Sequence, residues 1–62
     1  MIKNLTDWNQ DQLNWYVREI AWYKDQLKAM KELGMYEYIP DMEKALRHNY
    51  YMARKYRQKL AA

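Results

Sequence analysis

Apolar side chains recur at alternating intervals of three and four residues along two segments of the chain, and this spacing is the strongest constraint on its fold. In the first segment they are Leu13, Tyr16, Ile20, Tyr23, Leu27 and Met30. In the second they are Ile39, Met42, Leu46, Asn49, Ala53, Tyr56 and Leu60, with asparagine as the polar exception. This period places side chains on one face of an α-helix, whereas a half-buried strand alternates every two residues. The pattern predicts two amphipathic helices, each packed along one seam.

The only glycine of the chain lies between these two segments, and the only proline lies at the start of the second. Gly34 follows the first segment and predicts a helix C-terminal cap, because glycine enters the left-handed conformation without a Cβ clash. Pro40 is tolerated in the first turn of a helix. Thr6 is the expected N-cap. We therefore expect residues 1–62 to form one all-α domain, an antiparallel helical hairpin. Its parts are a first helix at about 6–33, a turn at about 34–39 and a second helix at about 40–60.

The chain is short for a stable core. A domain of 62 residues buries only about 60% of the surface that its unfolded form exposes. Cysteine is absent, and a single histidine, His48, is too few for an imidazole metal cage. We expect no metal or other cofactor, and we expect a second copy to supply the missing stability. The prediction is a homodimer in which two hairpins form a four-helix bundle, where Asn49 either fixes the register or lies at a wet edge.

In length and heptad layout the chain resembles the Rop family of plasmid copy-number regulators, which are dimers of helical hairpins. The resemblance implies the same four-helix architecture. It covers the layout of the chain and no matching motif residues, so it implies nothing about function.

Three tryptophans occupy equivalent positions in successive seven-residue repeats of the first segment. Trp8, Trp15 and Trp22 should form a column on the helix, about 100° from the column of Tyr16 and Tyr23. An apolar arc wider than one seam predicts contact with more than one neighbour. Two interpretations stay open: the indoles are buried between two copies of the hairpin, or part of the column binds a foreign protein. We expect these five aromatic residues to form the protein-binding surface.

Basic residues dominate the second half of the chain. From Lys44 to the end there are six basic residues and no acidic one, although the net charge is only +3. The candidates for a nucleic-acid site, with Tyr51 beside them, are Arg47, Arg54, Lys55, Arg57 and Lys59. The alternative is a solvated face whose charges suit a helix C-terminus. No recognition-helix motif with a short turn is present, so we expect any binding to be weakly sequence-specific.

Side chains that enzymes commonly use for catalysis are scarce. Cysteine and serine are absent, Thr6 is the only threonine, and His48 has no partner on its own face. Glu37, Asp41 and Glu43 cluster near the turn, where the helix dipole favours acids. There is no glycine-rich phosphate loop. We expect no enzymatic activity and no small-molecule substrate.

The longest uninterrupted apolar runs are four residues long, whereas a membrane span needs about 20. No secretory leader is evident, and the absence of cysteine fits a reducing compartment. We expect a cytoplasmic protein without membrane contact.

The leading hypothesis is a small regulatory or inhibitory homodimer that occupies a surface of a larger protein, as would suit a phage, plasmid or bacterial accessory factor. The alternative is a nucleic-acid-binding module.

Overall fold

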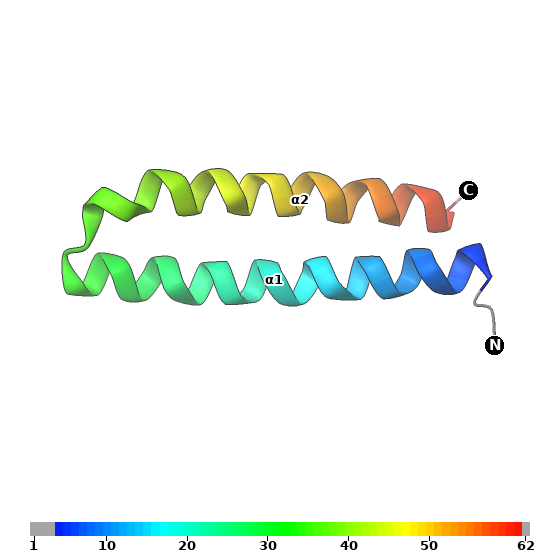
Figure 1. Cartoon of the computed structure of the whole chain (residues 1–62), viewed down its shortest axis with the longest axis horizontal. Helices are drawn as coiled ribbons and strands as arrows, with labels where there is room; N and C mark the ends of the chain where they lie inside the picture. The colour runs from blue at the N-terminus through cyan, green and yellow to red at the C-terminus, as the bar shows by residue number, and fades with distance from the viewer. Residues whose placement is uncertain (1–3, 62) are drawn as a thin grey trace.

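The chain folds into a hairpin of two long helices that lie side by side and run in opposite directions (Figure 1). The computed structural model describes residues 4–61. Helix α1 spans Leu5–Leu33, a short 3-10 helix, η1, spans Tyr36–Tyr38, and helix α2 spans Ile39–Ala61. The predicted all-α helical hairpin is confirmed, and the helices start and end within about one residue of the expected positions. Neither helix is long and apolar enough, within the described residues, to cross a membrane.

Helix α1 begins at a different cap from the one expected. Asn4 has an extended backbone (φ −75°, ψ 169°), and its side-chain oxygen accepts a hydrogen bond of 2.8 Å from the backbone N–H of Asp7. Its carbonyl oxygen accepts a second bond, of 3.1 Å, from the N–H of Trp8. Thr6 therefore lies inside the first turn, and the prediction that it caps the helix was wrong. Asparagine caps at least as well as threonine, and capping by Asn4 lengthens the helix.

Gly34 ends α1 as predicted. Its φ of 73° lies in the left-handed region. The N–H of Gly34 donates to the carbonyl oxygen of Lys31 at 3.3 Å, and the N–H of Met35 donates to that of Met30 at 2.8 Å. This pair of bonds is the Schellman motif, which satisfies carbonyl groups that the helix end would leave free. After η1 the chain enters α2 directly, with Pro40 in its first turn, where a missing N–H costs no helical bond.

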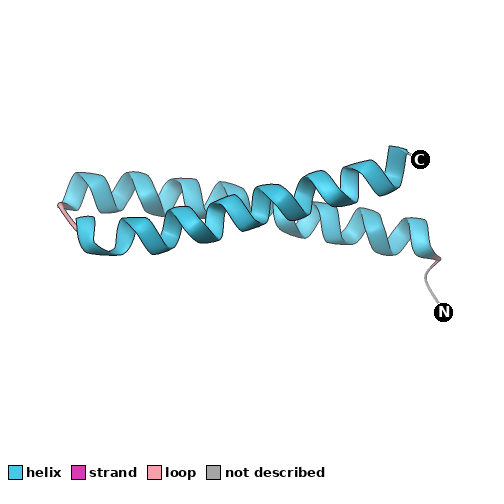
Figure 2. Ribbon diagram, turned by 90° about the horizontal axis from the view of Figure 1, so that it is seen from above, coloured by secondary structure: helices cyan, strands magenta, loops and turns pink. Residues whose placement is uncertain are grey.

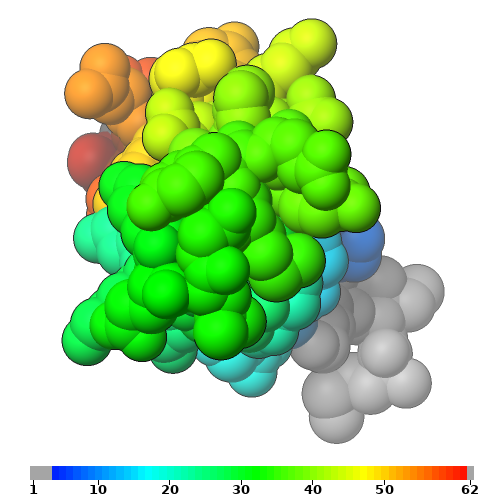
Figure 3. Space-filling view, turned by 90° about the vertical axis from the view of Figure 1, so that its left-hand side faces the viewer, coloured from blue at the N-terminus to red at the C-terminus, as the bar shows by residue number. Residues whose placement is uncertain are grey.

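The hairpin is a single layer of two helices, which cross at a shallow angle when seen from above (Figure 2). Its dimensions are 46 × 22 × 13 Å, and the smallest is close to the roughly 10–12 Å diameter of one helix. Seen from the turn end, the side chains around the turn cover the end of this layer (Figure 3). Apart from contacts with η1 at the turn, α1 and α2 pack only against each other among the described residues, so one seam of each is covered along its length.

The predicted seam residues pack between the helices. Ile20, Leu27 and Ala53 are buried, with exposed fractions of 8%, 8% and 0%, and the other predicted seam positions are buried or half-buried. The face of α1 opposite this seam carries charged residues at seven-residue spacing and is exposed throughout: Asp11, Arg18, Asp25 and Glu32. Among residues 4–61 no large side chain is fully buried. The seam is therefore continuous but shallow.

Two asparagines belong to this seam, Asn9 and Asn49, and both are 6% exposed. In residues 4–61, wherever a side-chain nitrogen or oxygen of a buried or half-buried residue is completely shielded from solvent, it has a hydrogen-bond partner. Asn49 also lines a hollow of about 470 Å³ with Tyr23, Ala45 and His48 among its neighbours. The Asn49 side chain is thus in the seam but beside a water-accessible hollow, and buried amides are tolerated where they keep such access.

Candidate interaction surfaces

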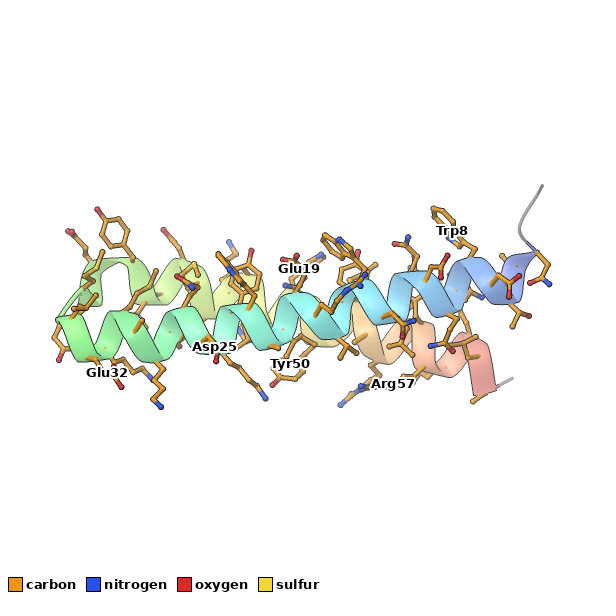
Figure 4. The ribbon with its side chains drawn as sticks, turned by 90° about the horizontal axis from the view of Figure 1, so that it is seen from below. Trp8, Glu19, Asp25, Glu32, Tyr50 and Arg57 are labelled. Atoms are coloured by element: carbon orange, nitrogen blue, oxygen red, sulfur yellow. The ribbon has the colours of Figure 1, made fainter. Side chains whose placement is uncertain are left out.

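The hairpin presents two different long edges, one on each side of the seam. Trp8 and Glu19 project from one edge, and Tyr50 and Arg57 project from the opposite edge (Figure 4). Further residues join each edge because they lie three, four or seven positions from an edge residue, line the same hollow, or contact a ring of that edge. We call the first the tryptophan edge: Trp8, Trp15, Arg18, Glu19 and Trp22. We call the second the basic edge: Lys24, Lys28, Lys31, Arg47, Tyr50, Tyr51, Arg54 and Arg57.

The three indoles of the tryptophan edge are each about half exposed, at 53% for Trp8, 47% for Trp15 and 52% for Trp22. Trp15 meets Tyr16 edge to face, with ring centroids 4.9 Å apart and planes at 89°. Trp22 meets Tyr23 in the same way, at 5.1 Å and 82°. Edge-to-face contact is a favourable aromatic geometry. Each of these two indoles is therefore held against a seam tyrosine while a large part of its surface remains in solvent.

A hollow of about 630 Å³ lies along α1, bounded by Trp15 and Trp22 and also lined by Tyr23. Its remaining lining residues are Arg18 and Glu19, which place opposite charges next to each other between the two indoles. Glu19 is half-buried and Arg18 is exposed. Aromatic walls around a few polar groups are typical of the contact centres of protein interfaces.

Tyr16 and Tyr23, predicted to share the binding surface, lie deeper than the indoles, although Tyr23 also lines the hollow between Trp15 and Trp22. Both are half-buried seam residues. The ring of Tyr16 stacks on that of Tyr56 from α2, with centroids 5.9 Å apart and planes inclined by 19°. The tyrosines therefore support the indoles from beneath, and the tryptophans supply the exposed aromatic area.

The basic edge is formed by both helices. The ammonium nitrogen of Lys24 on α1 lies 5.4 Å from the ring centroid of Tyr50 on α2, which is a cation–π distance. Arg54 and Arg57 line a hollow of about 370 Å³ together with Tyr50 and Tyr51. The two tyrosines are 43% and 64% exposed. Two arginine and two tyrosine side chains therefore line one accessible concavity.

The five basic residues predicted for a nucleic-acid site do not form one patch. Arg47, Arg54 and Arg57 belong to the basic edge, whereas the ammonium of Lys59 lies 5.0 Å from the ring of Tyr56 in the seam. Lys55 is also exposed, but it does not line the arginine–tyrosine hollow.

Lys24 was not among the residues predicted for the nucleic-acid site, because that prediction used only the basic residues of the second segment. The spacing of Lys24, Lys28 and Lys31 beside the α1 seam was the signal that could have revealed it.

The acidic residues near the turn, Glu37, Asp41 and Glu43, do not form a metal centre. In residues 4–61, no three histidine, cysteine or acidic side chains come together in a way that could hold a metal ion. Asp41 lines the hollow beside His48 and Lys44, so an acid and two nitrogen bases share that concavity.

Comparison with protein-family models, with curated proteins and with solved structures gave no match to this chain.

Proposed function

We propose that this chain is a small non-enzymatic regulatory or inhibitory protein that acts by protein–protein interaction through its tryptophan edge. The observation that supports the proposal is the alignment of three half-exposed indoles, Trp8, Trp15 and Trp22, on one side of α1. Tryptophan combines a large contact area with few rotatable bonds, so its burial against a partner loses little conformational entropy. An aligned set of three is an unusually apolar strip for a surface in permanent contact with water.

The thinness of the hairpin supports this proposal. The accessible surface is 5145 Å², whereas a compact monomer of 7.8 kDa exposes roughly 4400 Å². The hairpin is only 13 Å thick, about one helix, so the described chain has no second layer of helices that could pack over the indoles. Burial of the tryptophan edge therefore requires another chain.

A second copy of the chain is the first occupant in this proposal, and charge complementarity is the reason. Arg18 and Glu19 are adjacent, between Trp15 and Trp22. If two α1 helices pair in opposite directions about a two-fold axis between these charged residues, Arg18 faces Glu19 of the second copy. Trp15 then faces Trp22 of the second copy, and each two-fold contact occurs twice. The product is a homodimeric four-helix bundle.

A larger protein partner would bind the same edge by displacing the second copy. Binding to the monomer alone draws the monomer out of the dimer by mass action. Regulation in this scheme is an exchange of one aromatic contact for another, and the hairpin itself does not need to change shape.

Sedimentation equilibrium at micromolar concentration tests the dimer. We expect a mass twice the 7.8 kDa of the chain, and we expect the double variant Trp15→Gln, Trp22→Gln to weaken dimerisation by at least about tenfold. Tyr51→Gln, on the opposite side of the hairpin, is the matched control and should dimerise normally. A wild-type chain that stays monomeric and helical would contradict the proposal.

A charge exchange tests the two-fold arrangement itself. Arg18→Glu should bring carboxylates together across the axis, and Glu19→Arg should bring guanidinium groups together. Each single variant should weaken the dimer by about fivefold to tenfold. The double variant Arg18→Glu, Glu19→Arg restores opposite charges and should recover wild-type affinity. Additive losses in the double variant would exclude this arrangement without excluding a dimer of another geometry.

A further inference from the structure

The concavity on the basic edge combines the two side-chain types that single-stranded nucleic acids require. Arg54 and Arg57 line it together with Tyr50 and Tyr51. We propose that the basic edge binds single-stranded nucleic acid, with arginine on the phosphates and Tyr51 stacked on a base. Proteins that bind single strands without sequence preference use this combination of a cationic track and aromatic platforms.

The arginines supply the phosphate contacts. Arg54 and Arg57 are exposed, and their planar guanidinium groups match phosphate oxygens in a bidentate geometry. Arg47 lies seven residues before Arg54, on the same side of α2. From Arg47 to Arg57 the helix rises roughly 15 Å. The three groups therefore form a track along the helix rather than a single point of charge.

Helix α1 extends this track across the hairpin. Lys24 reaches over the Tyr50 ring at 5.4 Å, which places its side of α1 beside the arginine track. Lys28 and Lys31 follow four and seven residues later, so they lie near Lys24 along the helix. Acidic residues flank this track: Glu43 lies seven residues before Tyr50, toward the turn end of α2, and Asp25 and Glu32 of α1 lie on the same side of the hairpin as Tyr50 and Arg57 (Figure 4). The positive charge that no neighbouring acid offsets therefore lies along the arginines of α2, since the chain has no acidic residue after Glu43.

The tyrosines distinguish a nucleic acid from other anionic partners. Tyr51 is 64% exposed and Tyr50 is 43% exposed, and a base of any identity can stack on such a ring. An acidic protein would need the cations but no exposed rings. A membrane surface would need a basic helix whose apolar side is free to enter lipid, whereas the apolar side of α2 packs on α1. Single-stranded nucleic acid is the partner that uses both the charges and the rings.

This inference is independent of the proposed dimer. Tyr50 and Arg57 project from the side opposite Trp8 and Glu19 (Figure 4). A dimer joined through the tryptophan edge leaves the basic edges of both copies accessible. Loss of one activity in a variant should therefore leave the other intact.

Fluorescence anisotropy with a labelled oligothymidylate of about 12 nucleotides tests the proposal. At about 50 mM salt we expect micromolar binding that weakens steeply as salt rises. The double variant Arg54→Gln, Arg57→Gln should bind at least about tenfold more weakly, with the log–log salt slope reduced by about 1.4 because two phosphate contacts are lost. Lys55→Gln removes an exposed positive charge that belongs to neither edge and does not line the arginine–tyrosine hollow, so it is the matched control and should leave both values unchanged.

A second substitution tests the stacking contact. Tyr51→Leu should weaken binding by at least about fivefold with little change in the salt slope, whereas Tyr51→Phe keeps the ring and should bind normally. Circular dichroism should show unchanged helicity for all these variants, since the altered side chains are exposed. Absence of oligonucleotide binding at about 50 mM salt would overturn the proposal. Equal binding of inorganic polyphosphate or anionic vesicles, insensitive to Tyr51→Leu, would overturn it as well.

Discussion

The ring of Tyr16 on α1 stacks on the ring of Tyr56 on α2, with centroids 5.9 Å apart and planes inclined by 19°. Both residues are half-buried, in a hairpin whose described residues include no fully buried large side chain. In so shallow a seam, a stacked aromatic pair between the helices carries a larger share of the stability than it would in a deep core. The pair also lies nearer the open end of the hairpin than the turn, since Tyr16 is in the first half of α1 and Tyr56 is in the last two turns of α2.

A double-mutant cycle measures this contact. We expect Tyr16→Leu and Tyr56→Leu to be coupled by about 0.5–1.5 kcal/mol in the free energy of unfolding, because leucine keeps apolar area but loses ring stacking. Urea unfolding followed by circular dichroism, at one fixed protein concentration, gives the four values. The control cycle combines Tyr16→Leu with Tyr36→Leu, whose ring lies at the turn and is 65% exposed. The losses in unfolding free energy of these two variants should be additive. Coupling below about 0.3 kcal/mol in the Tyr16–Tyr56 cycle would show that the stack contributes nothing specific.

The N-terminal cap yields a second prediction. Asn4→Ala removes the acceptor of the 2.8 Å bond from the Asp7 N–H and should cost about 1 kcal/mol of unfolding free energy. Asn4→Ser retains a capping oxygen and should cost much less. Thr6→Ala, two residues along inside the helix, should change stability by less than about 0.5 kcal/mol. Thermal unfolding of the three variants checks this order, and a larger loss for Thr6→Ala would reassign the cap.

Gly34 permits a test of backbone conformation alone. A Cβ at this position would meet the nearest atom, on the Tyr36 ring, at 3.9 Å, which is ordinary contact. The cost of Gly34→Ala should therefore come from its φ of 73°, at about 1–2 kcal/mol. Gly34→Asn should lose less, because asparagine tolerates the left-handed region. A chain synthesised with D-alanine here should gain about 0.4–1 kcal/mol, and equal stability of the L- and D-alanine forms would contradict this account.

The seam and the turn could be predicted from the sequence, because each depends on a local rule. The three–four spacing identifies Ile20, Leu27 and Ala53 as packed residues, and Gly34, the only glycine of the chain, has the positive φ that ends α1. The first cap was mispredicted because Asn4 and Thr6 are both good caps within one turn of each other. Burial of Asn9 was missed because the predicted apolar seam began at Leu13.

The two edges were only partly predictable, because they depend on how the helices face each other. Heptad spacing aligns Trp8, Trp15 and Trp22 without reference to α2. The contact of Lys24 with Tyr50 is different, since it requires the antiparallel pairing and its register. Charge counting along α2 therefore included Lys59, which packs on a seam tyrosine, and left out the lysines of α1.

Asn49 and Ala53 are successive buried residues of the α2 seam, at 6% and 0% exposure, yet the same replacement should affect them in opposite directions. Ala53 has no exposed surface, so Ala53→Leu must push the helices apart and should cost about 1–3 kcal/mol. Asn49 lines the hollow of about 470 Å³, which has room for added methyl groups. Asn49→Leu should therefore raise the urea midpoint by adding apolar burial where an amide now sits.

The stabilised Asn49→Leu variant should also associate less selectively. A polar group in a helical seam disfavours registers that leave it without water or a partner, and leucine removes that restriction. Sedimentation velocity should then show species larger than the wild-type protein forms at the same concentration. Asn49→Asp, of nearly the same size, controls for shape and should be less stable than wild type because it places a charge at a 6% exposed site. A lower midpoint for Asn49→Leu than for wild type would mean that the amide stabilises the hairpin itself, and that the adjoining hollow is filled by ordered water rather than open to a larger side chain.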